Sequence, residues 1–209
     1  MNITLLFFLG LIFAAIGIIP PGLLNMTVAK ISLKDGYVRG MMFSIGACVV
    51  VAFQTSIAAI FAKYINNHPD VVDVLQRIAF VIFVLITIYY LVLAQKQPIP
   101  QGQKKIRSKE SRFFQGMLMS AINVFPIPYQ AYMTLTFASF GWMTFEKISI
   151  ISYVAGAVMG TFAMFYVYIF FFDKIKSKNV TSQKNMNYII GSVTGIIAII
   201  TLIKIIQEM

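Results

Sequence analysis

The stretch GIIPPGLLNMTVAKI, residues 17–31, sets two consecutive prolines and a glycine into a long apolar run. Proline inside a helix removes a backbone hydrogen bond and collides with the carbonyl four residues earlier, which costs ~3 kcal/mol or more in a water-soluble helix. An interruption of this kind needs a local reason. Because it lies inside an apolar segment long enough to cross a membrane, it decides the fold that we predict.

The composition outside this stretch is that of a membrane protein. The chain has 209 residues, of which 59% are hydrophobic and 11% charged, and its mean hydropathy is +0.82. A soluble domain carries roughly 25% charged residues. The net charge of +10 does not indicate nucleic acid, because the charges cluster at the ends of apolar segments, where they set orientation in a membrane. We therefore expect a lipid bilayer as the environment and no nucleic-acid partner.

Apolar stretches long enough to cross a hydrocarbon core of ~30 Å occur six times. The predicted spans are residues 3–29, 38–62, 74–94, 113–140, 148–172 and 188–206. The most polar connector between them is the basic segment 96–112. The sequence thus predicts an all-α polytopic membrane protein whose halves, residues 1–95 and 113–209, hold three spans each.

The distribution of Lys and Arg predicts the orientation. The first, third and fifth connectors hold thirteen of the seventeen basic residues, and the opposite side holds four. By the positive-inside rule the odd connectors are cytoplasmic, so both termini are predicted to face the outside.

Three spans per half make the second half run through the membrane upside down, as in the inverted repeats of many secondary transporters. In the first span of the second half, NVFPIPYQ, residues 123–130, again sets two prolines into an apolar segment. At ~1.5 Å per helical residue, Pro20 lies roughly 15 Å and Pro126 roughly 20 Å from the cytoplasmic face. We predict two inverted three-helix repeats with broken helices 1 and 4.

Backbone freed at this depth is tolerated where it is buried in protein or lines a water-filled cavity. Pro21 and Pro128 can each open a half-helix whose free N–H groups favour an anion. The carbonyls that end the preceding half-helices can accept hydrogen bonds from an ammonium group. A carboxylate beside an amine describes an amino acid. The candidate substrate-binding residues are Pro20, Pro21, Gly22, Asn25, Asn123, Pro126, Pro128 and Gln130.

Other features keep two interpretations each. Asn25 and Asn123 either contact the solute or satisfy freed carbonyls. Gln54, Thr55 and Ser56 either line the pathway or bond to neighbouring helices. Glycine pairs at spacing four, at 156–160 and 191–195, indicate packing faces within the bundle or between protomers, so a homo-oligomer stays open.

No Asp or Glu lies well inside a predicted span, which argues against transport of metal cations and leaves proton coupling without an obvious carrier. Asp35 and Asp173, at cytoplasmic span ends, are the nearest candidates, and solvated capping is the alternative for both. With one cysteine, Cys48, and one histidine, His68, the spans lack a metal-site or catalytic cluster. We expect no metal, no cofactor and no enzyme.

The quoted stretches resemble a known family. PPGLLNMTVAKISLKDGYVRGMMFSIGA, residues 20–47, resembles the first two spans of the LysE/RhtB family of bacterial amino-acid exporters, in which a Pro-Gly motif precedes a cytoplasmic turn and a glycine-spaced helix. FFQGMLMSAINVFPIPYQAY, residues 113–132, is similar to the family's fourth span, and MNYIIGSVTGIIAIITLIK, residues 186–204, to its last. The resemblance covers nearly the whole chain.

Two departures fall at the predicted site. Leu23 follows Gly22 where the family commonly has Pro-Gly-Pro, and two residues separate Asn123 from Pro126 where it commonly has Asn-Pro and then a basic residue. The resemblance implies proton-driven efflux of an amino acid or related small zwitterion across the bacterial inner membrane, and leaves the solute open. The rival interpretations are export of another small organic solute, and a membrane scaffold or assembly factor whose kinks serve packing only.

Overall fold

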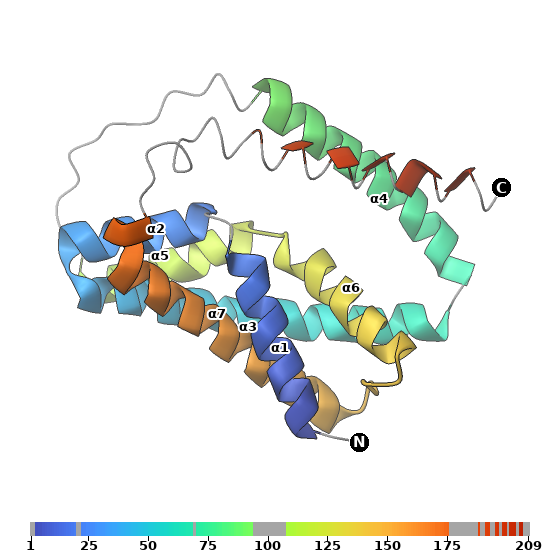
Figure 1. The fold of residues 1–209 in the computed structure, drawn as a ribbon, viewed down its shortest axis with the longest axis horizontal. Helices are drawn as coiled ribbons and strands as arrows, with labels where there is room; N and C mark the ends of the chain where they lie inside the picture. Colours follow the sequence, from blue (N-terminus) through green and yellow to red (C-terminus); the bar gives the residue numbers. More distant parts are fainter. Residues whose placement is uncertain are drawn as a thin grey trace. The chain divides into compact units, whose positions relative to one another are not determined.

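The computed structural model describes residues 3–19, 22–68, 70–93 and 108–175, together with positions 188, 191–192, 195–196, 198–199, 201–203 and 205–206. Every regular element in these residues is helical, which confirms the all-α class for them (Figure 1). The elements are α1 (Ile3–Ile18), α2 (Leu23–Asp35), α3 (Tyr37–Asn67), α4 (Asp70–Ile88), the π-helical turn η1 (Tyr89–Leu93), α5 (Lys109–Ile122), α6 (Pro126–Ser139) and α7 (Lys147–Ile175).

The helices overlap the first five predicted spans, and both predicted interruptions are present; the sixth predicted span, residues 188–206, is described only in part. Helices α1 and α2 together cover the first span, and α5 and α6 together cover the fourth. Among the described residues, Tyr37–Asn67 and Lys147–Phe171 are long and apolar enough to cross a membrane. The pair α1 and α2, bent by 80° at its break, provides a third candidate. Six crossings and the inversion of the halves stay predictions.

The chain forms two compact units. The first comprises Met1–Asn66 and Lys104–Ile175, and so holds α1 to α3 and α5 to α7. The second comprises Asn67–Gln103 and Lys176–Met209, and so holds α4, η1 and the C-terminal segment. The first two predicted spans of each half thus belong to one unit, and the third span of each half belongs to the other.

In the first unit α1 lies along α7, and glycines allow the two backbones to approach closely (Figure 1). A Cβ at Gly10 would overlap the carbonyl oxygen of Tyr153 on α7. A Cβ at Gly156 or Gly160 would overlap a backbone carbonyl of α1 in the same way. The prediction that 156–160 is a packing face is therefore confirmed, with α1 as its partner.

Helix α5 approaches α3 by the same kind of contact. A Cβ at Gly116 would overlap the carbonyl oxygen of Phe43, and a Cβ at Gly46 would overlap that of Phe113. As a result, α5 can lie against the second span of the first half as closely as α1 lies against the second span of the second half.

The two helix pairs use corresponding residues. Phe7 and Gly10 on α1 correspond to Phe113 and Gly116 on α5, each 106 residues later in the chain. The contacting residues of α3 and α7 correspond at a separation of 110 residues, which is also the separation between the first residues of these two helices. One contact between a broken helix and its neighbour therefore occurs twice in the unit, residue for residue.

The core of the first unit lies between α1, α6 and α7, around the buried side chains of Leu6, Phe137, Met143 and Tyr153. In the second unit Gly191 lies against the Leu91 side chain of η1, so this glycine pair also marks a packing face.

Candidate functional site

The first break lies between α1 and α2. Helix α2 begins after Gly22, whose backbone is extended (φ −91°, ψ 178°) and which provides no side-chain cap. The N-terminal end of a helix carries about half a positive charge, so this uncapped end favours an anion. Pro20 and Pro21, two of the predicted site residues, lie outside the described residues.

The carbonyls at the end of α1 are held by side chains. Asn25 Nδ2 donates to the Ile18 carbonyl at 2.6 Å, and the Tyr168 hydroxyl of α7 donates to the Ile19 carbonyl at 2.8 Å. Asn25 is 5% exposed. Of the two interpretations of Asn25, this contact is the one expected of structural support, since it satisfies a carbonyl that lost its helical partner.

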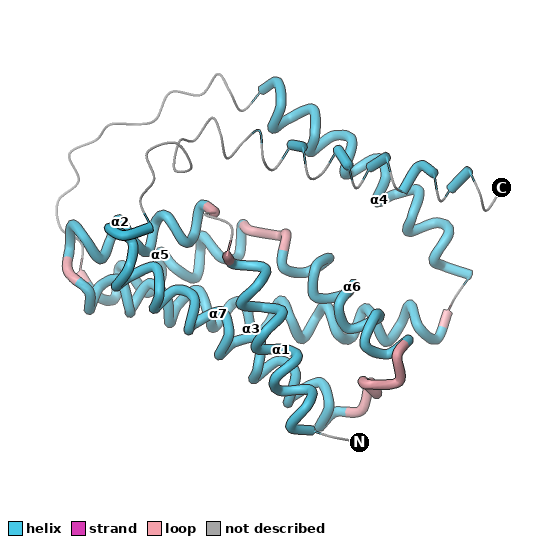
Figure 2. Tube along the Cα trace, in the orientation of Figure 1, coloured by secondary structure: helices cyan, strands magenta, loops and turns pink. Residues whose placement is uncertain are grey.

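The second break lies between α5 and α6 and is visible as a short non-helical segment (Figure 2). Gln54 Nε2 of α3 donates to the carbonyls of Ser120 and Asn123 at 3.0 and 2.9 Å. Gln54, predicted as a pathway residue, thus caps the end of α5. In the contact between Asn123 and Gln54, Asn123 takes part through its backbone carbonyl and not through its side-chain amide.

The N-terminal turn of α6 differs from that of α2. The helix begins at Pro126, two residues before the predicted Pro128, which instead stands within the first turn. Neither proline has an N–H group. The N–H groups between and after them, of Ile127 and Tyr129, donate to the carbonyls of residues 124 and 125. The turn formed by residues 126–129 therefore has no free N–H group, contrary to the expectation for this end, because two of its residues are prolines and the turn uses the other two N–H groups.

The two broken helices touch each other. The Tyr129 hydroxyl of α6 donates to the Phe13 carbonyl of α1 at 2.8 Å. A Cβ at Gly17 would lie 3.0 Å from Tyr129 Cε1, so the ring packs directly over the last turn of α1. The structure thus brings the two breaks together within one unit.

The remaining predicted polar residues have different surroundings. Gln130, 3% exposed, accepts a hydrogen bond from the Tyr153 hydroxyl at 2.5 Å. Ser56 donates to Ala52 on its own helix at 2.8 Å. Thr55 is fully buried, and its hydroxyl has no hydrogen-bond partner.

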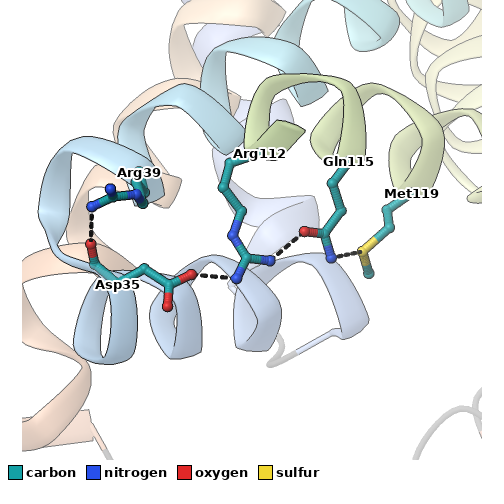
Figure 3. A network of polar contacts seen from close by, with 5 residues as sticks. All are labelled: Asp35, Arg39, Arg112, Gln115 and Met119. Atoms are coloured by element: carbon teal, nitrogen blue, oxygen red, sulfur yellow. Dashed lines mark hydrogen bonds and ion pairs between the residues drawn. The ribbon is translucent and has the colours of Figure 1, made fainter. Parts of the chain in front are cut away.

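A buried ion pair joins the end of α2 to the beginning of α5 (Figure 3). Arg112 Nη2 pairs with Asp35 Oδ2, and the two side chains are 9% and 8% exposed. Arg112 Nη1 donates to Gln115 Oε1 at 2.5 Å, and Arg39 donates to the Asp35 backbone carbonyl at 2.8 Å. Solvated capping, one of the two interpretations of Asp35, is therefore wrong, because the Asp35 side chain is buried against Arg112. Sequence reasoning did not bring α5, the helix that carries Arg112, to this residue.

Sequence reasoning missed the buried tyrosines. Tyr168 lies in the aromatic run of residues 162–172, which the sequence explains as a packed or lipid-facing helix surface. The available signal was chemical, because a buried phenol hydroxyl usually needs a hydrogen-bond partner. Among the described residues, no three His, Cys, Asp or Glu side chains gather to hold a metal ion.

Apolar helices of spanning length, together with an interrupted helix whose carbonyls are capped from neighbouring helices, define a helical membrane protein. The sequence profile of the LysE type translocator family matches residues 15–204, a range that includes both breaks and the ion pair. The chain belongs to the LysE type translocator family, and is thus a membrane transporter of small solutes. Neither a curated protein nor a solved structure matches the chain.

Proposed function

We propose that this protein exports amino acids or related small zwitterions from the cytoplasm by alternating access around its two helix breaks. The observation that carries the proposal is the contact of Tyr129, in the first turn of α6, with the last turn of α1 at Gly17. Two interrupted helices that meet in one unit can present backbone and side-chain polar groups to one solute. The membrane is the bacterial inner membrane.

The repeated packing contact supports two inverted three-helix repeats. Gly10 on α1 lies ten residues before Pro20, and Gly116 on α5 lies ten residues before Pro126. Gly10 packs against a backbone carbonyl of α7 and Gly116 against one of α3, so each contacts the long helix of the opposite half. Duplicated contacts of this kind are expected from two halves with the same fold. Alternating access follows when one half rocks against the other around a fixed site.

The uncapped N-terminus of α2 supports binding of the solute's carboxylate at the first break. Gly22 has no side chain to satisfy the first N–H groups of α2 or to keep a ligand away. In the first turn of α6, residues 126–129, no N–H group is free. The carboxylate therefore binds at α2, beside the predicted residues Pro20, Pro21 and Gly22.

The ion pair supports a closed gate on one side of the site. Asp35 ends the second half of the first broken helix, and Arg112 lies in the first half of the second. With the orientation predicted from the basic connectors, both lie at the cytoplasmic end. The pair must separate for cytoplasmic solute to enter. Asp35 is also the buried acid at that end. We therefore propose it as the group that couples opening of the pair to the proton gradient.

Transport by the purified full chain tests the proposal. Proteoliposomes loaded with a standard amino acid should exchange it for external radiolabelled amino acid, and an imposed proton gradient should drive net movement. Empty liposomes serve as the control. Exchange of a different organic solute in the same assay, with no amino acid moved, would replace the substrate class.

A second candidate function is that of a membrane scaffold or assembly factor. The observation that favours it is that Asn25, Tyr168 and Gln54 satisfy carbonyls at both breaks, as kinks used for packing alone would require. Proteoliposomes that move no solute under any ion gradient would favour this function over transport.

A further inference from the structure

The second break holds buried oxygen atoms that no described residue satisfies. Among the described residues, four buried side-chain polar atoms have no hydrogen-bond partner. One, Arg112 Nε, belongs to the ion pair. The other three are Gln54 Oε1, Thr55 Oγ1 and Ser120 Oγ. Ser120 is in the last turn of α5, and Gln54 is bonded to it, so two of the three atoms lie at the same helix end.

The side-chain amide of Gln54 is anchored at this helix end. Its Nε2 donates to the Ser120 carbonyl at 3.0 Å and to the Asn123 carbonyl at 2.9 Å. Since both donor hydrogens are used, the amide cannot be turned over without losing two hydrogen bonds. Its Oε1 is therefore fixed as a free acceptor at the end of α5, the helix end that also carries Ser120, and both residues are at least nine-tenths buried.

The first turn of α6, which follows this helix end, offers these oxygens no free N–H group. The α6 turn that follows has prolines at 126 and 128, and the N–H groups of Ile127 and Tyr129 are already used. Gln54 Oε1 can only accept a hydrogen bond, whereas the Ser120 hydroxyl can accept or donate, so the fixed acceptor of Gln54 favours a cation here.

The first break has the opposite character. The Ile18 and Ile19 carbonyls already accept hydrogen bonds from Asn25 and Tyr168, and none of the unsatisfied buried atoms found among the described residues belongs to this break. The uncapped N-terminus of α2 faces it. One break therefore offers acceptors and the other a helix N-terminus.

We infer that Gln54 Oε1 and Ser120 Oγ bind the protonated amine of the transported solute, with the carboxylate directed toward α2. The inference rests on the proposed function and deepens it, because it assigns a polarity to the site and makes a primary ammonium group the required feature of the substrate. An ammonium supplies three donors and no acceptor, which is the complement of this helix end. Gln54 also positions the site, since it holds the end of α5.

Ser120→Ala tests the inference cleanly. The Ser120 hydroxyl has no partner among the residues that the structure describes, so removing it breaks no described hydrogen bond. A structural role alone predicts unchanged transport and an unchanged or higher melting temperature, because a buried unsatisfied hydroxyl is lost. Ser44→Ala is the matched control, since Ser44 is equally buried on α3 but donates to its own helix at Gly40.

The measurement is counterflow in proteoliposomes of the full chain. Each radiolabelled standard amino acid is used in turn, and the one that wild type moves fastest is competed with its unlabelled form and with its N-acetyl derivative. Wild type should be inhibited by the free amino acid and not by the N-acetyl derivative. In Ser120→Ala the concentration for half-maximal counterflow should rise about 10- to 100-fold, the range for losing a hydrogen bond to a charged group. Ser44→Ala should match wild type.

Each contrary outcome has a distinct meaning. If wild type moves amino acids and Ser120→Ala moves them equally well, or if N-acetyl derivatives compete fully, the inference is overturned and the proposed function stands. If Ser120→Ala changes counterflow only through its response to sodium, measured by replacing choline with sodium, then the oxygens hold an inorganic cation. That result overturns the inference. If wild type moves no amino acid, the proposed function itself fails and takes the inference with it.

Discussion

At the scale of single residues, each break is held by side chains that reach it from elsewhere in the chain. Asn25 and Tyr168 satisfy the carbonyls of the first break, and Gln54 satisfies those of the second. Lipid offers a freed carbonyl no partner, so these side chains make broken backbone tolerable at the predicted depth. Asn25 and Tyr168 thus support the first break, whereas Gln54 supports the second break and, in our inference, also binds the solute.

The two asparagines are expected to behave differently when replaced. Asn25→Ala leaves the Ile18 carbonyl unpaired and should lower the free energy of unfolding by about 1–3 kcal/mol, with weaker transport as a consequence. Asn123→Ala keeps the backbone carbonyl that Gln54 holds, so its stability should stay near that of wild type. Thermal unfolding in detergent, alongside counterflow, measures both effects.

Equal melting temperatures for the two variants would show that the Asn25 amide does not support the break. Membrane insertion, followed by the yield of full-length protein in the membrane fraction, serves as the control and should be retained in both. Full transport by both variants would remove the asparagines from the site.

The sequence could identify polar residues at this scale, but not their partners. Gln54 was recognisable as part of a polar patch in an apolar span. Its partner Ser120 is 66 residues away, and the carbonyl that Tyr168 satisfies is 149 residues away. Such pairs arise from helix packing, and hydropathy and proline spacing carry no information about which helices are neighbours.

At the scale of the elements, glycines set which helices are neighbours. Gly10 and Gly116 bring α1 against α7 and α5 against α3, close enough that a methyl group would strike a carbonyl oxygen. Van der Waals packing drives helix association in lipid, and it is strongest where backbones approach most closely. Sequence reasoning found the glycine pair at 156–160 as a packing face, but could not name its partner helix.

The ion pair at the ends of α2 and α5 should behave as a coupled unit. Arg112→Gln leaves the Asp35 carboxylate buried without its partner and should cost about 3–5 kcal/mol of stability. The double variant Asp35→Asn with Arg112→Gln removes both charges and should recover most of that loss. Thermal unfolding of the wild type, the two single variants and the double variant measures the coupling.

If Asp35 and Arg112 form the cytoplasmic gate, the double variant should be stable, but its transport should be coupled differently to the proton gradient. The reason is that its gate would open without separating two charges. Arg39→Gln is a suitable comparison, because Arg39 contacts the same residue through its backbone carbonyl. Single-variant losses that simply add in the double variant would contradict an interaction between the two side chains.

At the scale of the whole molecule, the two predicted halves are divided between the compact units in the same way. The first two predicted spans of each half share one compact unit, and the third of each half belongs to the other. Hydropathy could predict the helices, and proline spacing could predict both interruptions, because these properties are local. The division of each half between units depends on contacts distant in sequence, and was not predictable from those patterns.

Orientation in the membrane provides the last prediction. With odd connectors in the cytoplasm, Lys109 at the start of α5 should face the cytoplasm and Glu146 before α7 should face the outside. The single native cysteine, Cys48, is 6% exposed and gives little background. Lys109→Cys should therefore react with a membrane-impermeant maleimide in inverted vesicles, and Glu146→Cys in right-side-out vesicles, since both native side chains are exposed. Reaction of both from the same side would refute an odd number of crossings between them, and with it the inverted arrangement of the halves.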